Sequence, residues 1–239
     1  MLLPQPAALV VAHPGHELRL FHWLEQERPA VFVLTDGSGR SGRSRLESTR
    51  EVLAATGCAE GSVMGRFTDR EIYRAILERD VREVAAVTRE LSGALAQFRT
   101  VVCDAMELYN PTHDLCHVMT MLAAPPSIER FAYAVVDPPG DGITLTLDDD
   151  AFARKIAMAH RYDDLATDID ELTSHIGVDA LRREVFFRPA STAPSTKPYY
   201  EIRGEEQVRA GKYQTVLRYR EHFLPFLEAL AASQQPKNE

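Results

Sequence analysis

Cysteine is scarce in this 239-residue chain, which contains only Cys58, Cys103 and Cys116. Their number is odd and no two of them form a CxxC pair, so a disulfide framework is not expected. Such cysteine usage is typical of a protein in a reducing compartment, and it predicts a cytoplasmic location.

Basic residues are fewer than acidic ones, and long apolar runs are missing. Lys and Arg number 27 against 35 Asp and Glu, which gives a formal net charge of −8. An acidic chain is a poor match for nucleic acid or for an anionic membrane surface. No apolar run approaches the roughly 20 residues that cross a bilayer, and no basic segment precedes the apolar stretch near the N-terminus. Neither a signal peptide nor a membrane span is expected.

Nucleotide-binding glycine motifs are absent as well. No GxGxxG follows the first apolar run, and the chain has no Walker-type loop. The hexamer GSGRSG at residues 37–42 matches neither pattern. A nucleotide-dependent Rossmann enzyme is therefore disfavoured.

What the sequence does contain is a β-α-β-α rhythm. Apolar runs at residues 7–12, 30–34 and 100–103 are predicted to be buried parallel strands. Helices are predicted between and after them, at residues 16–26, 46–56, 70–98 with room for one break, and 114–122. The pattern predicts one α/β domain over residues 1–239. Its fold class is a Rossmann-like, doubly wound, mainly parallel sheet with helices on both faces.

The second half of the chain is less regular. Strands are predicted at residues 131–136 and 143–147, the latter as an edge strand or hairpin arm. Further helices are predicted at residues 148–160, at 164–176 and from 213 to the end. Residues 187–197 are predicted to be a flexible loop and residues 232–239 a frayed tail.

Histidines follow two of the predicted strands. His13 and His16 come directly after the first strand, and His113 follows the strand at residues 100–103. Because α/β sheets bind ligands beyond the carboxyl ends of their strands, we expect these side chains to converge. Three imidazoles with one open position are typical of a catalytic zinc site. The alternative is that His16 caps the N-terminus of the following helix and His13 fills a polar niche. His117, one helical turn after His113, is interpreted as a helix residue, with a supporting role beside the metal as the alternative.

Two motifs carry a resemblance to a known family. AHPGHE at residues 12–17 resembles the AHPDDE motif of the LmbE-like (PIG-L) N-acetylglucosaminyl deacetylase superfamily, and NPTH at residues 110–113 resembles its HPDH motif. Segments at residues 34–39, 45–57, 67–69 and 145–162 resemble further parts of that family in the same order. The resemblance covers most of the chain. It implies a zinc ion, or another divalent transition metal, and hydrolysis of an N-acetyl group on an amino sugar or sugar conjugate.

Carried over by position, the resemblance implies metal ligands at His13, His16 and His113, with a histidine at position 16 where the family has an aspartate. The family's catalytic base falls on Gly15, and the histidine that polarises its substrate falls on Asn110. The residues at the family's metal-binding positions can therefore still bind a metal, while those at its acid–base positions are replaced.

Other residues are candidates for the missing chemistry. Glu17 is the first candidate for the catalytic base, Asp114 is a base or an orienter of a ligand histidine, and Asn110 can donate to an oxyanion. Arg45 and Asp69 are predicted to contact the substrate, Arg45 through a phosphate or a sugar hydroxyl. Supporting or capping roles, or a solvated charge for Arg45, are the alternatives.

The leading hypothesis is therefore a zinc-dependent N-deacetylase of an N-acetylated sugar. The positive loop at residues 37–45 favours an anionic substrate, such as a phosphosugar or sugar nucleotide. The alternatives are a metal-containing binding protein without turnover and a metal-dependent esterase. The sequence does not fix the oligomeric state, so a homo-oligomer stays open.

Overall fold

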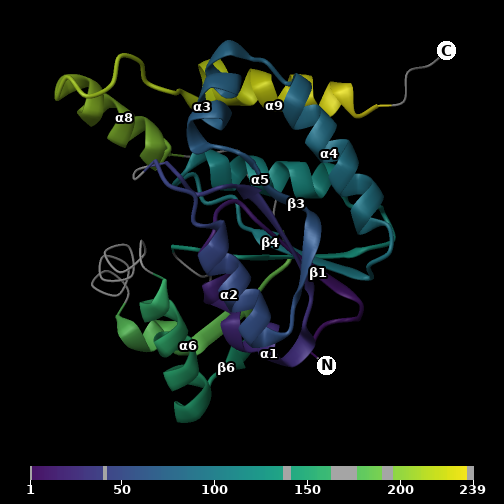
Figure 1. Ribbon diagram of the computed structural model, residues 1–239. Coiled ribbons are helices and arrows are strands. Elements are labelled where there is room, and N and C mark those ends of the chain that lie inside the picture. The colour runs from purple at the N-terminus through teal and green to yellow at the C-terminus, as the bar shows by residue number, and fades with distance from the viewer. Residues whose placement is uncertain (1, 40–41, 137–140, 163–176, 190–195, 236–239) are drawn as a thin grey trace.

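A five-stranded parallel sheet forms the centre of the molecule (Figure 1). The structure is a computed structural model, and it describes residues 2–39, 42–136, 141–162, 177–189 and 196–235. The strand order is β3-β2-β1-β4-β5, with β1 (Ala7–Val11), β2 (Ala30–Thr35), β3 (Ala59–Phe67), β4 (Thr100–Asp104) and β5 (Glu129–Tyr133). The chain moves outward from β1 and then crosses back to β4, so its direction reverses between these two strands. This is the predicted doubly wound, Rossmann-like arrangement.

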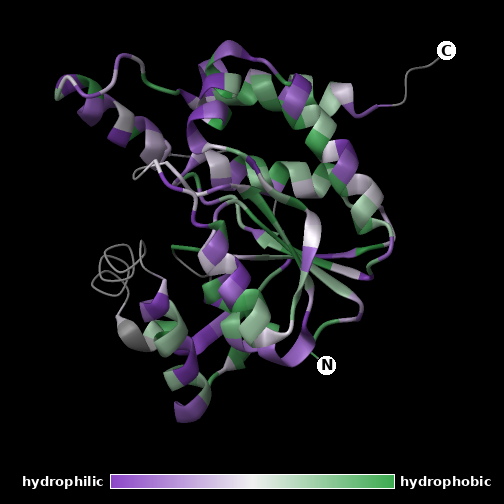
Figure 2. Cartoon of the chain, viewed as in Figure 1, coloured by the Kyte–Doolittle hydropathy of each residue, from purple (hydrophilic) through white to green (hydrophobic). Residues whose placement is uncertain are grey.

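Helices cover both faces of the sheet. One face carries α3 (Asp69–Glu78), α4 (Arg82–Leu95), α5 (Pro111–Ala123) and α9 (Leu224–Ser233), and the other carries α1 (Phe21–Glu27), α2 (Leu46–Thr56) and α6 (Asp149–Arg161) (Figure 1). Successive side chains of a strand point to opposite faces. In β1, Val10 belongs to the core under α5, and Leu9 and Val11 belong to the core under α1. Burial on both sides explains the continuous apolar run of β1. Figure 2 shows the central strands of the sheet largely in green, the colour of hydrophobic residues.

The first half of the chain follows the predicted pattern, with several differences. The stretch at residues 70–98 breaks once, where Arg79 adopts a positive φ of 56° at the end of α3. The stretch at residues 16–26 begins as a 3-10 turn, His16–Leu20, before α1. No apolar run predicts β3, because it is an edge strand with only two buried residues and with two glycines. At Gly61 a Cβ would lie 2.3 Å from the Phe32 ring, so the glycine permits close packing on β2.

Several predictions in the second half need correction. The strand predicted at residues 131–136 is β5, which begins and ends earlier. The arm at residues 143–147 is β6 (Ile143–Thr146), which pairs antiparallel with an unpredicted strand, β7 (Arg183–Phe186). An unpredicted helix, α8 (Tyr199–Arg209), follows; its Gly204 lowers helix propensity but packs closely on Val216.

The helix predicted from residue 213 is wrong over its first residues. Gly211, with a φ of 70°, follows the end of α8, and the β-branched Thr215 and Val216 lie in an irregular stretch. A π turn, Tyr219–Phe223, then leads into α9. Because α9 continues to Ser233, the tail predicted from residue 232 begins too early. The helix predicted at residues 164–176 and residues 190–195 of the predicted loop lie outside the described residues.

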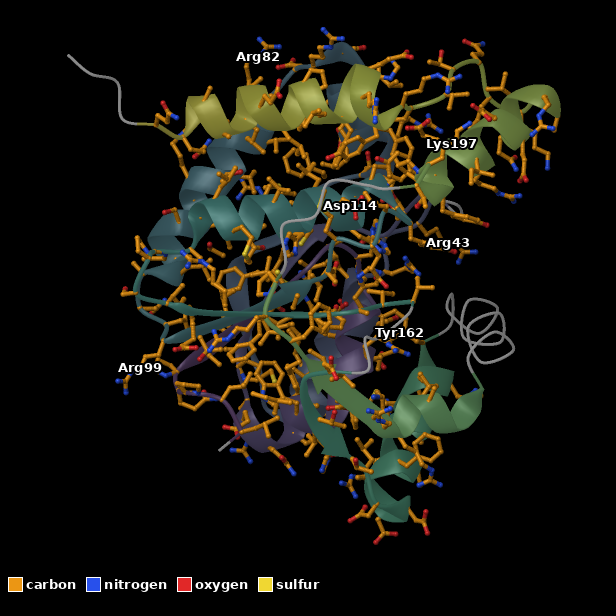
Figure 3. The ribbon with its side chains drawn as sticks, turned by 180° about the vertical axis from the view of Figure 1, so that it is seen from behind. Arg43, Arg82, Arg99, Asp114, Tyr162 and Lys197 are labelled. Atoms are coloured by element: carbon orange, nitrogen blue, oxygen red, sulfur yellow. The ribbon has the colours of Figure 1, made fainter. Side chains whose placement is uncertain are left out.

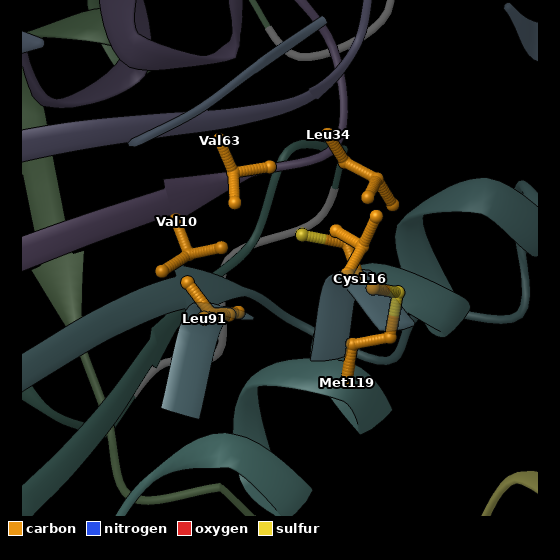
Figure 4. Close-up of a pocket in the computed structure, with 7 residues that line it drawn as sticks. Val10, Leu34, Val63, Leu91, Cys116 and Met119 are labelled. Carbon is orange, nitrogen blue, oxygen red and sulfur yellow. The ribbon is translucent and has the colours of Figure 1, made fainter. Parts of the chain in front are cut away.

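A small void lies in the core between the sheet and the α4–α5 face (Figure 4). Its volume is about 10 Å³, and its lining is apolar: Val10, Leu34, Val63, Val87, Leu91, Cys116 and Met119. A space of this size holds at most one water and offers it no strong hydrogen-bond partners. It is a packing gap rather than a ligand site. Among the described residues no helix is both long and apolar enough to cross a bilayer.

Candidate metal centre

Three histidines meet beyond the carboxyl ends of β1 and β4. These strands are parallel neighbours, with Val10 opposite Cys103, so the loops that follow them emerge side by side. His13 and His16 lie on the loop after β1, and His113 lies in the first turn of α5. Their ring centroids are 5.1, 5.0 and 4.4 Å apart. One nitrogen from each ring lies within 4.8 Å of the others, so the cluster can hold a metal ion, as predicted.

The turn between His13 and His16 depends on Gly15. Its φ of 103° lies in a region that residues with a Cβ rarely adopt. The backbone N–H of His16 donates to the carbonyl of His13 over 3.3 Å, which closes the turn. The backbone conformation therefore explains why position 15 is a glycine, although glycine has no side chain that could act as a base.

His13 is held through its Nδ1 atom. Nδ1 lies 2.8 Å from the Thr35 hydroxyl and 3.2 Å from Oδ1 of Asp69. Because the Thr35 hydroxyl donates to the Ala12 carbonyl, it accepts from His13, and the imidazole proton belongs on Nδ1. Nε2 of His13 is then an acceptor; it is buried and has no hydrogen-bond partner among the described residues.

His16 is held by a carboxylate that the sequence reasoning missed. Its Nδ1 lies 3.0 Å from Oδ2 of Asp104, the last residue of β4. Asp104 is fully buried and also accepts from the Ala12 N–H and the Tyr133 hydroxyl. Burial raises the pKa of Asp104, but His16, His113 and the Tyr133 hydroxyl outweigh it, so the pKa is lowered overall. The sequence signal was a charged residue that ends an apolar strand before a histidine loop.

The ring nitrogens of His113 and His13 suit a metal ion. Nδ1 of His113 is buried without a hydrogen-bond partner among the described residues. Burial, together with the proximity of His16, lowers the pKa of His113 to about 3, and burial lowers that of His13 as well. Both rings are therefore neutral at pH 7, which is the form that binds metals. Zinc–nitrogen bonds of about 2.0–2.1 Å in a tetrahedron place ring centroids roughly 5 Å apart, close to the observed spacing.

Two predicted catalytic residues have structural contacts. The carboxylate of Glu17 is fully buried, and it accepts from the Gly15 N–H over 2.7 Å and from the Tyr162 hydroxyl over 3.2 Å. Figure 3 labels Tyr162. Burial raises its pKa. Asn110 is the N-cap of α5, where its side-chain oxygen accepts from the Thr112 N–H over 2.9 Å. The helix therefore begins at Pro111, earlier than the predicted residue 114.

Asp114 braces the loop between β4 and α5. Its Oδ1 accepts from the backbone N–H groups of Glu107 and Leu108 over 3.0 and 3.1 Å. Burial raises its pKa to about 7. His117 also lies in α5, where its Nδ1 donates to the Asp104 carbonyl. It is buried but lies outside the three-histidine cluster.

Both predicted substrate residues lie near the cluster. Asp69 begins α3, and its carboxylate approaches His13 as described above. Arg45 donates from Nε to the Gly37 carbonyl over 3.0 Å, and its charge acts on both His13 and Asp69. Burial raises the pKa of Asp69, although the positive charge of Arg45 opposes this. Gly39 packs closely on Asp69, since a Cβ at Gly39 would lie 2.5 Å from the Asp69 carboxylate.

Comparisons with known proteins add little to this description. No family model and no curated protein matches the sequence. Among solved structures, the chain is similar to the glycotransferase of kitacinnamycin, at 13% identity and a TM-score of 0.33. The match covers 74% of this chain and 42% of that one, so the chain spans less than half the length of that protein. Such a weak likeness bears on neither the site nor the activity.

Proposed function

We propose that the cluster binds one zinc ion and that the protein is a zinc-dependent hydrolase of the LmbE-like type. Its proposed reaction is removal of an N-acetyl group from an amino sugar or sugar conjugate. The observation that carries the proposal is the cluster itself, in which buried nitrogens of His13 and His113 have no other partner among the described residues. Its place at the reversal point of the sheet, where such folds bind ligands, supports a functional role.

The chain orients two of the three proposed ligands before any metal arrives. Thr35 and Asp69 hold His13, and Asp104 holds His16, each through Nδ1. Hydrogen bonds of this kind fix the tautomer of a ligand histidine and the direction of its ring. Bound zinc supplies Lewis acidity toward a carbonyl oxygen and toward water.

The proton-accepting step is assigned to Glu17 in this proposal. It directly follows His16, and burial raises its pKa, which makes its carboxylate a stronger base at neutral pH. Asn110 is the proposed hydrogen-bond donor to the oxyanion, and Arg45 is the proposed contact to an anionic part of the substrate. Glu17, Asn110 and Arg45 each also make a hydrogen bond within the protein.

Metal content and acetate release test the proposal together. We expect about one zinc per chain by mass spectrometry, none in a His13→Ala, His113→Ala double variant, and native content in the exposed His160→Ala control. Zinc-loaded protein should release acetate from at least one member of a panel of N-acetylated sugars, phosphosugars and sugar nucleotides. Bound zinc without acetate release from any of them would refute the deacetylase.

Glu17→Gln tests the proposed base. The amide can keep the acceptor for the Gly15 N–H but cannot take up a proton, so acetate release should fall by roughly 10²–10⁴-fold with zinc still bound. Tyr162→Phe is the matched control, because it removes the hydroxyl that contacts Glu17 and leaves the carboxylate. Undiminished turnover in Glu17→Gln would limit this residue to support of the turn.

A metal-containing binding protein is the second candidate. It is favoured by the contacts of Glu17 with Gly15 and Tyr162 and by the capping role of Asn110, because these contacts engage the two groups proposed for catalysis. It predicts that calorimetry detects binding of a sugar from the same panel while acetate stays absent. Acetate release by the native protein would eliminate this candidate.

A further inference from the structure

Two tyrosines form an exposed stack near the histidine cluster. The rings of Tyr109 and Tyr199 are parallel within 3°, with centroids 4.8 Å apart. Tyr109 is 41% exposed and Tyr199 is 47% exposed, which is unusual for two large rings in contact. Tyr109 comes from the loop after β4 and Tyr199 from the first turn of α8, so two distant segments form one stack. In a parallel stack each ring covers one face of the other, and the opposite face of each ring is the outer face.

The backbone holds this surface in place. The N–H of Tyr199 donates to the carbonyl of Leu108 over 2.9 Å, which joins α8 to the loop. Leu108 has a φ of 57°, a left-handed conformation that few residues other than glycine adopt. Asp114 fixes that conformation by accepting from the Leu108 N–H, and Glu107 accepts from the N–H groups of Val135 and Val136. Strained backbone that its neighbours hold in place is frequent at binding sites.

The stack lies close enough to the metal ligands to touch a bound substrate. The Tyr109 ring centroid is 6.4 Å from that of His113, with the planes inclined by 38°. A molecule with one group at the histidine cluster can therefore reach Tyr109. Charged groups that suit hydroxyls, Asp69 and Arg45, lie near His13 on the same cluster.

We propose that this stack is an aromatic platform whose outer ring face binds the flat face of a sugar ring carried by the substrate. The faces of tyrosine rings are electron-rich and attract the C–H bonds on the apolar face of a pyranose, while the sugar hydroxyls point outward to polar groups. This inference rests on the proposed function for the choice of a sugar. The platform itself depends only on the geometry of the two rings.

Binding of N,N′-diacetylchitobiose, measured by calorimetry, tests the platform. The Tyr109→Ala, Tyr199→Ala double variant should bind this disaccharide at least about tenfold more weakly, as expected for loss of a stacked aromatic face. The double Phe variant should bind like the native protein, because the rings remain. Ile202→Ala is the matched control, since Ile202 lies in α8 and is 41% exposed. Zinc content should be the same in all four proteins.

The outcomes separate the platform from the hydrolase. Tyrosine-dependent binding of the disaccharide without acetate release would support the platform and remove the deacetylase. If acetate release and disaccharide binding both persist in the double Ala variant, the deacetylase is supported and the platform is removed. Failure of the native protein to bind the disaccharide, or tyrosine-dependent binding of uridine in its place, would overturn the assignment to a sugar ring.

Discussion

A single carboxylate, Asp104, holds the His16 ring, which is a proposed metal ligand. It is buried at the end of β4 and contacts His16, the Ala12 N–H and Tyr133. We predict that Asp104→Asn weakens zinc binding by roughly 10–100-fold, because the ring loses a charged acceptor for its Nδ1 proton. Competition with a chromophoric chelator measures this affinity. Asp148→Asn, at the N-cap of α6, is the control and should keep native affinity; equal affinity in both variants would contradict the role of Asp104.

A second carboxyl group, Asp114, makes stability depend on pH. Its folded pKa of about 7 lies above the ordinary value of 3.8, so the folded chain retains a proton that the unfolded chain releases. The free energy of unfolding therefore falls through this group as pH rises from about 4 to 7. A change of one in pKa corresponds to about 1.4 kcal/mol, so the fall amounts to a few kcal/mol.

Asp114→Asn isolates this effect, because asparagine does not titrate. We predict that the difference in unfolding free energy between native protein and variant shifts in favour of the variant between pH 5 and pH 8. Denaturant unfolding in the presence of a chelator measures both proteins without bound metal. A difference that stays constant over this range would mean that Asp114 does not titrate there.

At the scale of elements, the start of α3 places Asp69 beside His13. The Thr68 hydroxyl accepts from the Glu71 N–H, and the Glu71 carboxylate accepts from the Thr68 N–H, which forms a capping box. We predict that Thr68→Ala lowers the free energy of unfolding by about 1 kcal/mol. Thr68→Ser should keep native stability, because serine retains the capping oxygen. Equal loss in both variants would point to the methyl group instead of the cap.

The sequence predicts the fully buried strands and the helices that alternate with them. β1, β2 and β4 have unbroken apolar runs because both faces of the sheet are covered. β3 and β7 give no comparable signal, since β3 is an edge strand with only two buried residues and β7 has only four residues. The sequence does not predict α8, because Gly204 lowers its helix propensity. The contact between Gly204 and Val216 is tertiary and cannot be inferred from local residues.

The candidate site could be predicted to a similar extent. The convergence of three histidines followed from their positions after parallel strands, and the structure brings them together. Asp104 and Thr35 could not be assigned in advance, because their contacts with His16 and His13 depend on strand register and side-chain direction. The stack of Tyr109 on Tyr199 depends on an element that the sequence reasoning did not find.

At the scale of the whole molecule, zinc binding should be linked to stability. A ligand that binds only the folded state raises the unfolding free energy by about 2.7 kcal/mol at a concentration of 100 times its Kd. We predict a higher thermal midpoint with zinc than with chelator. The His13→Ala, His113→Ala variant should show one midpoint under both conditions. A native midpoint that ignores zinc would argue against a metal at this cluster.

The pairing of β1 with β4 also sets the order of events when the chain folds. The contact between Ala12 and Asp104 joins residues 92 apart in sequence, and His113 lies still further along. Closing so long a loop has a large entropic cost, which slows folding relative to local structure. On a ribosome, the first two histidines emerge some hundred residues before the third. The complete histidine cluster depends on the pairing of β4 with β1, so we expect an ion that needs all three histidines to stabilise the finished fold rather than its first strands.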